Sequence, residues 1–345
     1  MNSEFTFITS HATDYSRSGV LLSYLSKQGQ ISGIIKFNSW KSLLSFAKEI
    51  IKANSCTDYY VIMNPSQFLT PVVKFLTTKK IILDAGWPLI EKSRAKNLSL
   101  LQKIKRGKSW IVDFVSMHLA NLVLLESEMQ KIKTSKRFRV AKKKIEVSLT
   151  GVEEEAFVNI PKASSSNSHF KVGFRGKYTL EAGLEVLAKT TQLCLDPEVS
   201  FLVLAPNIPS NIIFASNTLI ENNPYPSKRE MAEILVTCDV LLGQLSDHPR
   251  LNVTIPHKAF EAAAMGKPYL SSRATGIQEF LVEGVEAEYF KAGDASDLLL
   301  HIQKLKREKK YCEMLSVNIK QKYERVASEK AIGEKFLALI DLKFA

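Results

Sequence analysis

The chain has 345 residues, of which 45% are hydrophobic, and it carries a formal net charge of +12 at pH 7. This length is sufficient for two domains of ordinary size, each with its own core. No apolar run approaches the length that spans a bilayer, and residues 1–4 lack the basic and apolar regions of a signal peptide, so we expect a cytoplasmic protein. The four cysteines are scattered without the spacing of a metal site, which indicates buried free thiols.

The positive charge is concentrated in the first half of the chain. Residues 1–165 contain 25 Lys and Arg against 13 Asp and Glu, whereas the remainder contains 22 of each. Much of the excess lies in two clusters, residues 92–108 and 131–144. Such clusters are either solvated helix faces or a surface for a polyanion, and the sequence leaves both interpretations open. Of the polyanions, an anionic membrane is favoured over a nucleic acid, because the clusters hold few aromatic residues to stack on bases.

Hydrophobic periodicity predicts alternating strands and helices through the first 150 residues. Short β-branched and aromatic runs predict strands, and apolar residues spaced three and four apart predict helices. The predicted strands are residues 5–9, 31–37, 59–63, 80–84, 122–125 and 144–147, and the predicted helices lie around residues 20–25, 40–53 and 114–120. This alternation is typical of a parallel α/β sheet.

A second α/β half is predicted after a polar segment at residues 163–168, which is rich in serine and has the composition of a linker. The predicted strands beyond it are residues 170–174, 200–204, 239–242 and 268–271, and the predicted helices are residues 180–193 and 228–238. In open α/β sheets, ligands bind beyond the carboxyl ends of the strands. We therefore expect the functional residues at those ends.

Residues 254–268 are typical of a loop, a helix and a strand that together bind an anion. Pro256 can begin the helix, and Gly266 can adopt the left-handed conformation that ends it. The free N–H groups and the dipole of a helix N-terminus attract negative charge. Lys258 lies in the first turn, where the dipole disfavours a cation, which suggests a bound anion. Glu261, one turn further on, could accept hydrogen bonds from a ribose, so the segment predicts a nucleotide site.

This segment resembles the nucleotide-sugar site of the family 4 ("group 1") glycosyltransferases of GT-B fold. Their Glu-Ala-Met-Ala-x-Gly-x-Pro pattern is similar to residues 261–268, and their later Gly-x-x-Glu is similar to residues 276–279. The likeness extends over roughly residues 171–305. It implies an α/β chain of two Rossmann-like domains whose parallel sheets face each other across a cleft. The implied parts are an acceptor domain over residues 1–165, a nucleotide-sugar domain over 166–325, and a helix over 326–345 that packs back on the first domain.

The resemblance also implies roles for the matching residues. Glu261 would bind the donor ribose, while Lys258 and Arg175 would lie near the diphosphate and neutralise it during catalysis. One departure is Val253, which stands where the family usually carries a second Glu that touches the donor sugar. A subset of the family has an Arg-x-x-x-x-Ile-Pro-x-Lys arrangement instead, and residues 250–258 resemble it. The remaining donor-binding residues that we predict are Lys177, Arg250, His257, Thr275, Gly276 and Glu279.

Four further candidates lie at positions that the resemblance places near the acceptor or the donor sugar. Asp84 ends a predicted strand of the first half, where it is either an acceptor base or the cap of a turn. His11 follows the first strand, a position more typical of a turn residue than of a base. Gln244 and Asp247 lie in the loop before the donor helix and could contact the sugar in place of the missing Glu.

The predicted function is transfer of a sugar from a nucleotide-sugar donor to a glycan or lipid-linked acceptor of the cell envelope. By resemblance the reaction is retaining. We expect no metal and no cofactor, because cations and a helix terminus would neutralise the leaving diphosphate. The basic first half predicts peripheral association with the inner face of an anionic membrane, and a nucleic-acid partner is disfavoured. The alternatives are a GT-B nucleotide-sugar epimerase and, from another class, a non-catalytic basic nucleic-acid-binding protein.

Overall fold

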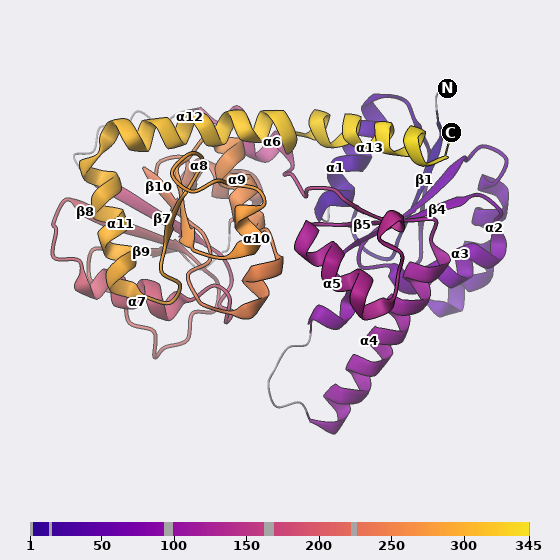
Figure 1. Ribbon diagram of the computed structural model, residues 1–345, viewed down its shortest axis with the longest axis horizontal. Coiled ribbons are helices and arrows are strands. Elements are labelled where there is room, and N and C mark those ends of the chain that lie inside the picture. The colour runs from indigo at the N-terminus through magenta and orange to yellow at the C-terminus, as the bar shows by residue number, and fades with distance from the viewer. Residues whose placement is uncertain (1–2, 14–15, 93–98, 162–168, 222–225, 345) are drawn as a thin grey trace. The chain divides into compact units, whose positions relative to one another are not determined.

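The computed structural model describes residues 3–13, 16–92, 99–161, 169–221 and 226–344. The chain forms two compact units, which are residues 1–150 together with 332–345, and residues 151–331. The boundary at residue 150 precedes the linker predicted at residues 163–168, all of which lies outside the described residues. Each unit is an α/β fold built on its own parallel sheet of six strands, as the alternating pattern predicts (Figure 1).

The first unit is built on a sheet with the strand order β2-β1-β3-β4-β5-β6. Every neighbouring pair is parallel. The strands are β1 (Phe5–Thr9), β2 (Ile31–Lys36), β3 (Tyr59–Ile62), β4 (Lys80–Gly86), β5 (Leu122–Leu125) and β6 (Ile145–Val147). All five residues of β1 are buried, because a parallel sheet is covered by helices on both faces.

Two separate apolar clusters cover the two faces of this sheet. One cluster joins the sheet to α1 (Ser16–Lys27) and to the C-terminal helix α13 (Glu329–Phe344), which contributes Ile332, Phe336 and Ile340. The other cluster receives side chains from the helices α2 (Leu43–Ala53), α3 (Thr70–Leu76), α4 (Leu100–Leu119) and α5 (Glu128–Phe138). The last thirteen described residues of the chain thus complete the core of the first unit.

The second unit has the strand order β12-β11-β10-β7-β8-β9, again with parallel neighbours. Its strands are β7 (Phe170–Arg175), β8 (Val199–Leu204), β9 (Thr218–Glu221), β10 (Val240–Leu242), β11 (Tyr269–Ser272) and β12 (Glu288–Phe290). Its helices are α6 (Glu154–Phe157), α7 (Leu184–Leu193), α8 (Lys228–Leu235), α9 (His257–Met265), α10 (Thr275–Gln278), α11 (Ala295–Arg307) and α12 (Lys309–Val326). Among the described helices, none combines the length and the apolar character that crossing a membrane requires.

The structure extends one predicted helix and shortens another. The helix expected at residues 114–120 is the end of α4, which begins at Leu100 behind a capping box made by Ser99 and Gln102. Its first turns are rich in Lys and bury no residue, so they lack the core-facing surface expected of the other predicted helices. The helix expected at residues 180–193 begins only at Leu184, because Gly183 precedes it in the left-handed conformation with φ of 68°.

Gly333 lies where α13 crosses α1, against the ring of Tyr24. A Cβ at this position would collide with the ring close to its attachment point, where the side chain cannot swing away. Gly333→Ala should therefore lower the free energy of unfolding by about 1–2 kcal/mol, since overpacking outweighs the gain in helix propensity. Urea and thermal unfolding followed by circular dichroism measure the change.

Gly107 of α4 provides a matched control, because a Cβ there meets nothing within 4 Å. Gly107→Ala should be neutral or stabilising by up to about 1 kcal/mol. Equal shifts in the two variants would contradict close packing of α13 on α1.

Candidate functional site

The carboxyl ends of β7 and β10 lie side by side in the middle of the second sheet, where the strand order reverses direction. Open α/β sheets form their ligand crevice at such a switch point. β7 ends at Arg175 and is followed by Gly176, while β10 is followed by Gly243. Gly243 lies against the hydroxyl groups of Tyr269 and Ser271 on β11, so no side chain would fit there. These glycines let the chain pass close to the polar groups of the crevice.

A buried carboxylate binds two basic side chains at this point. Glu261 is only 4% exposed, and its Oε2 accepts a hydrogen bond of 2.5 Å from Nε of Arg175. A second nitrogen of the guanidinium donates to Oε1, which completes a bidentate pair. Nδ1 of His257 lies 2.9 Å from the same Oε1. Burial by itself raises the pKa of Glu261, but Arg175 and His257 outweigh it and hold that pKa below its usual value.

The neighbouring Lys258 is also buried, with 9% of its surface exposed. Its Nζ lies 3.8 Å from the ring centroid of Phe174 and donates a hydrogen bond of 3.1 Å to the carbonyl oxygen of Gly243. Desolvation and the adjacent charge of Arg175 lower the pKa of Lys258 well below its usual value, and Glu261 opposes the shift only in part. The ammonium group is therefore poorly stabilised as a cation until an anion arrives.

Helix α9 positions Glu261, His257 and Lys258. It begins after Pro256 and ends at Gly266, which has the left-handed conformation expected from the sequence, with φ of 64°. Because residues 257 and 261 are one turn apart, both side chains face Arg175. Arg175, His257, Lys258 and Glu261, which the sequence predicted for one site, thus converge within the second unit.

The other predicted residues of this unit lie around the cluster with different partners. Arg250 donates a hydrogen bond of 3.1 Å to Glu181, and Thr275 contacts Asn252 through its side chain. Gly276 packs against the backbone of residues 251 and 254, so the need for a glycine there comes from packing. Of four more predicted residues, Lys177, Asp247 and Glu279 are exposed, and Gln244 is partly buried.

Gln244 differs from those neighbours because it follows Gly243 directly. Its side-chain Oε1 is buried and finds no hydrogen-bond partner among the residues that the structure describes. Such an acceptor is unusual in a folded protein and is commonly satisfied by a ligand or a water molecule.

The first unit gives Asp84 a role that the sequence did not predict. Asp84 is 1% exposed, and its carboxylate accepts hydrogen bonds from Arg17 and Ser18 of α1. Arg17 also donates to the backbone carbonyl groups of Leu124 and Ser148. This carboxylate joins α1 to the sheet, and its role as an acceptor base stays a prediction. His11 is exposed, and its ring lies 2.8 Å from the hydroxyl of Ser10.

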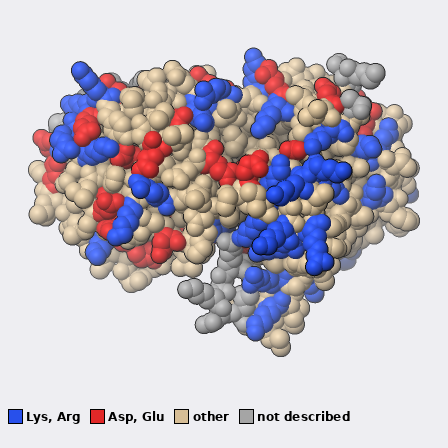
Figure 2. Space-filling model, viewed as in Figure 1, with Lys and Arg blue, Asp and Glu red and all other residues tan. Residues whose placement is uncertain are grey.

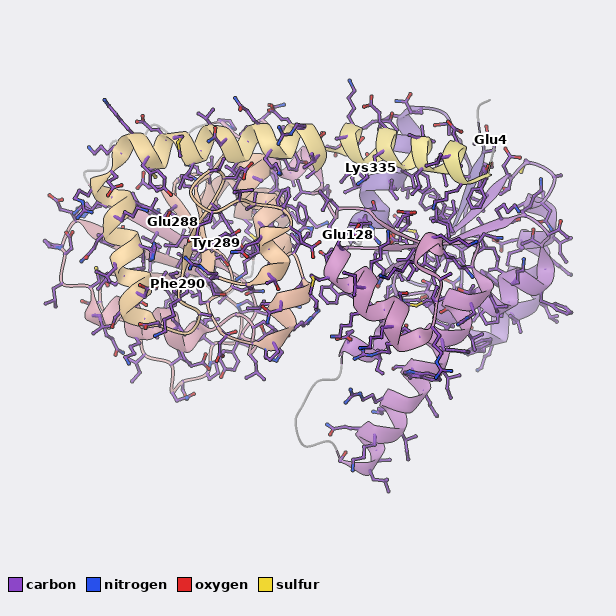
Figure 3. The ribbon with its side chains drawn as sticks, viewed as in Figure 1. Glu4, Glu128, Glu288, Tyr289, Phe290 and Lys335 are labelled. Carbon is purple, nitrogen blue, oxygen red and sulfur yellow. The ribbon has the colours of Figure 1, made fainter. Side chains whose placement is uncertain are left out.

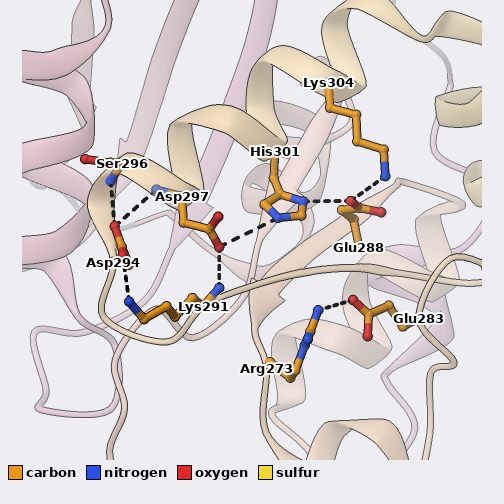
Figure 4. A network of polar contacts seen from close by, with 9 residues as sticks. All are labelled: Arg273, Glu283, Glu288, Lys291, Asp294, Ser296, Asp297, His301 and Lys304. Carbon is orange, nitrogen blue, oxygen red and sulfur yellow. Dashed lines mark hydrogen bonds and ion pairs between the residues drawn. The ribbon is translucent and has the colours of Figure 1, made fainter.

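A second polar network surrounds Glu288 of the edge strand β12 (Figures 3 and 4). Its carboxylate receives Nδ1 of His301 at 2.6 Å, Nζ of Lys304 at 2.8 Å and the hydroxyl of Tyr311. Burial raises the pKa of Glu288, yet these three groups reverse the effect and lower the pKa to about 2. Because these groups come from α11 and α12, the network fastens both helices to the sheet. It lies away from the switch point, and we assign it to stability.

No group of three or more His, Cys, Asp and Glu side chains that could hold a metal ion occurs among the described residues. The cluster around Glu261 contains a single carboxylate and three basic groups, which suits an anionic ligand.

Comparison with known proteins supports the assignment of the fold. A family model described as glycosyl transferase-like matches residues 192–332, a span that includes α9. The structure of Anabaena Alr3699/HepE in complex with UDP is similar to this chain, with a TM-score of 0.75 and 11% identity over 98% of this chain and 100% of that one. Sucrose-phosphate synthase from Thermosynechococcus elongatus has a TM-score of 0.71 and 12% identity, with 99% of each chain covered. This chain has the GT-B fold.

The lipopolysaccharide outer core galactosyltransferase WaaB in its apo form is also similar, with a TM-score of 0.66 and 11% identity over 99% of this chain and 100% of that one. No curated protein matches the sequence. The fold predicted from residues 261–279 is confirmed by these structures, whose low identities establish the fold alone.

The site also contains groups that the sequence did not single out. Phe174 stacks under Lys258, and Gly243 accepts its hydrogen bond. The hydroxyl groups of Tyr269 and Ser271 on β11 lie beside Gly243. The sequence did show two signals, an aromatic residue directly before Arg175 and a glycine directly after a strand. They indicate one site only because β7 and β10 are adjacent in the sheet.

Removing the negative charge of Glu288 should destabilise the second unit in a pH-dependent way. The pKa of Glu288 lies below its usual value of 4.5, so its contribution is fully present above pH 4.5 and is lost as the pH falls toward about 2. Glu288→Gln should lower the free energy of unfolding by about 1–3 kcal/mol at pH 7, and the difference from wild type should shrink below pH 4.5. Thermal unfolding at a series of pH values measures this.

The matched control is Glu283→Gln. Glu283 forms an exposed pair with Arg273, and such pairs contribute less than about 1 kcal/mol (Figure 4). A stability difference for Glu288→Gln that does not depend on pH would contradict a network held by the ionised carboxylate.

Proposed function

We propose that this chain is a glycosyltransferase that binds a nucleotide-sugar donor in its second unit. The observation that carries the proposal is the convergence of Arg175, His257, Lys258 and Glu261 at the switch point, inside a chain of GT-B fold. The glycosyl transferase-like family match over residues 192–332 supports it. HepE is described in complex with UDP and with UDP-glucose, so we infer a donor of the same class for this chain.

The proposed chemistry depends on charge at the leaving group. When the bond from the sugar to the diphosphate breaks, negative charge grows on the diphosphate oxygens. Arg175, Lys258 and the N-terminus of α9 would lower the energy of that charge in a partly buried site, where electrostatic interactions are strong. A transferase supplied with these groups requires no divalent cation, so we propose a metal-independent reaction, and by resemblance a retaining one.

Glu261 has a limited capacity to bind the donor ribose. Its Oε1 already accepts from Arg175 and His257, whereas Oε2 accepts only from Arg175. One lone pair of Oε2 therefore remains for a ribose hydroxyl. Glu261 would also hold the guanidinium of Arg175 in the orientation that meets the diphosphate. Gln244, with its unpartnered Oε1, is the proposed contact for the sugar.

The acceptor is proposed to be a glycan or a lipid-linked glycan. WaaB is described as a lipopolysaccharide outer core galactosyltransferase, and its fold covers nearly the whole of this chain. The strongly basic first 165 residues favour an acceptor at a negatively charged surface.

A direct test combines nucleotide binding with product analysis. Isothermal titration with UDP and GDP should show binding, and incubation with a panel of nucleotide-sugars should release the nucleoside diphosphate and transfer or hydrolyse the sugar. Absence of binding by any nucleoside diphosphate would overturn the proposal. Recovery of an epimerised nucleotide-sugar as the main product would instead identify an epimerase.

Substituting the two cations should lower turnover more than stability. Lys258→Met and Arg175→Gln each remove charge that is needed most in the transition state, so each should reduce kcat by about 10²–10³. Lys189→Ala, on the exposed face of α7, is the charge-matched control and should leave kcat unchanged. EDTA should not alter the wild-type rate. Inhibition by EDTA that Mg²⁺ or Mn²⁺ restores, or full activity in the double variant, would contradict this mechanism.

Nucleotide binding should be accompanied by proton uptake. The pKa of Lys258 is lowered in the free protein, and a bound diphosphate should raise it, so a proton is taken up between those two pKa values. Affinity for UDP should accordingly fall as the pH rises through that window. Calorimetry at pH 8.5, where the phosphate is already ionised, in buffers of different ionisation enthalpy measures the uptake. Equal uptake in Lys258→Met would assign it to another group.

A further inference from the structure

The first half of α4 presents apolar side chains to solvent. Leu100 and Leu101 are 75% and 72% exposed, and Ile104 and Ile111 are 49% and 56% exposed. The helix projects beyond the rest of the first unit along this stretch (Figure 1). Large apolar residues that gather on one exposed helix are uncommon on a soluble surface and indicate an interaction site.

Three of these side chains form one stripe with cations at its edges, while Leu101 lies about 100° from Leu100, beyond Lys108. At about 100° per residue, Leu100, Ile104 and Ile111 fall within about 40° of one another around the helix axis. Lys103 and Lys108 flank the stripe at about 60° and 80° from Leu100, on opposite sides. Lys105 and Arg106 lie further round. Long basic side chains in this arrangement can extend to a headgroup layer while the apolar stripe lies deeper.

The cations of α4 are available to a partner, unlike three cations of the neighbouring α5. Within the residues that the structure describes, no ion pair engages Lys103, Lys105, Arg106 or Lys108. On α5, Lys131 pairs with Glu146, and both Lys133 and Arg137 pair with Glu91. Figure 2 shows Lys and Arg gathered over the part of the first unit that contains α4 and α5.

The second half of α4 holds the exposed half in place. Asp113 accepts hydrogen bonds of 2.9 Å from the backbone N–H groups of Leu89 and Ile90. Trp110 stacks on Phe114 with ring centroids 5.1 Å apart and contacts Phe138. At the free end, the capping box of Ser99 and Gln102 satisfies the helix N-terminus without a partner. The stripe thus lies on a helix whose second half is fixed by packing and whose N-terminal end is capped.

We propose that residues 100–111 of α4 form a membrane-docking helix that lies in the interface of an anionic bilayer. Its apolar stripe enters the boundary between headgroups and acyl chains, and the flanking lysines bind lipid phosphates. Stacking residues for bases are few on this helix, since Trp110 is engaged with Phe114 and Phe138, which disfavours a single-stranded nucleic acid. The proposal concerns the first unit and does not depend on the reaction proposed for the second.

The test is flotation of the full chain with vesicles of phosphatidylcholine and with vesicles that contain 30% phosphatidylglycerol, at physiological salt. Wild type should bind only the anionic vesicles. Leu100→Ser/Leu101→Ser/Ile104→Ser should weaken that binding more than tenfold through loss of buried apolar surface. Lys103→Gln/Lys105→Gln/Lys108→Gln should weaken it by at least tenfold, given about fivefold for each cation at such a surface.

The control variant is Leu44→Ser/Ile51→Ser, which removes two exposed apolar residues from α2 and should bind like wild type. UDP titration of every variant shows that the second unit is intact and separates this test from that of the proposed reaction. The proposal is overturned if wild type ignores anionic vesicles, if the apolar variant binds as well as wild type, or if the α2 control loses binding equally. Binding of a single-stranded RNA without vesicle binding, or a dimer that the apolar variant dissolves, would overturn it as well.

Discussion

The candidate site depends on the buried carboxylate of Glu261, which binds the basic side chains around it. Arg175, His257 and Lys258 crowd the ends of β7 and β10, and Glu261 is the one acidic side chain bonded within the group. Two cations brought together out of water repel each other and lose hydration. The bidentate pair of Glu261 and Arg175 offsets that cost for Arg175. For Lys258, an aromatic ring, a carbonyl oxygen and the charge of Glu261 offset the cost only in part. The free protein therefore holds Lys258 in an environment that a diphosphate would improve.

The geometry of the parallel sheet makes this arrangement possible. All strands of the second unit point their carboxyl ends the same way, so β7, β10 and the loop before α9 deliver their polar residues to one edge. Helix α9 then places its first and second turns against Arg175. Glycines at positions 176 and 243 keep space open beside Lys258 and Tyr269. The side chains that would bind a ligand thus lie on a rigid edge rather than on a long loop.

The first unit uses the same type of pair for a different purpose. Arg17 and Asp84 are 2% and 1% exposed, and Arg17 also binds two backbone carbonyl groups. The pair therefore joins α1 to β4, to β5 and to the residue that follows β6. On the surface of this unit, cations of α4 that have no carboxylate partner among the described residues flank exposed leucines and isoleucines.

Local chemistry was sufficient to predict much of this protein. Alternating apolar runs predicted the strands, and Pro256, Gly266 and the small residues between them predicted α9, because these features depend on backbone preferences over a few residues. The GT-B fold followed from the resemblance of residues 261–279, and the convergence of Arg175 with Glu261 from the same comparison.

The tertiary structure alone decided which group each charged side chain pairs with. Asp84 and Asp113 are both acids within apolar surroundings in the sequence, yet one binds Arg17 and the other binds backbone N–H groups. Likewise, the stripe on α4 is exposed because no other element that the structure describes covers it. Such outcomes depend on contacts between residues far apart in the chain, such as the 67 positions that separate Arg17 from Asp84, and periodicity carries no information about them.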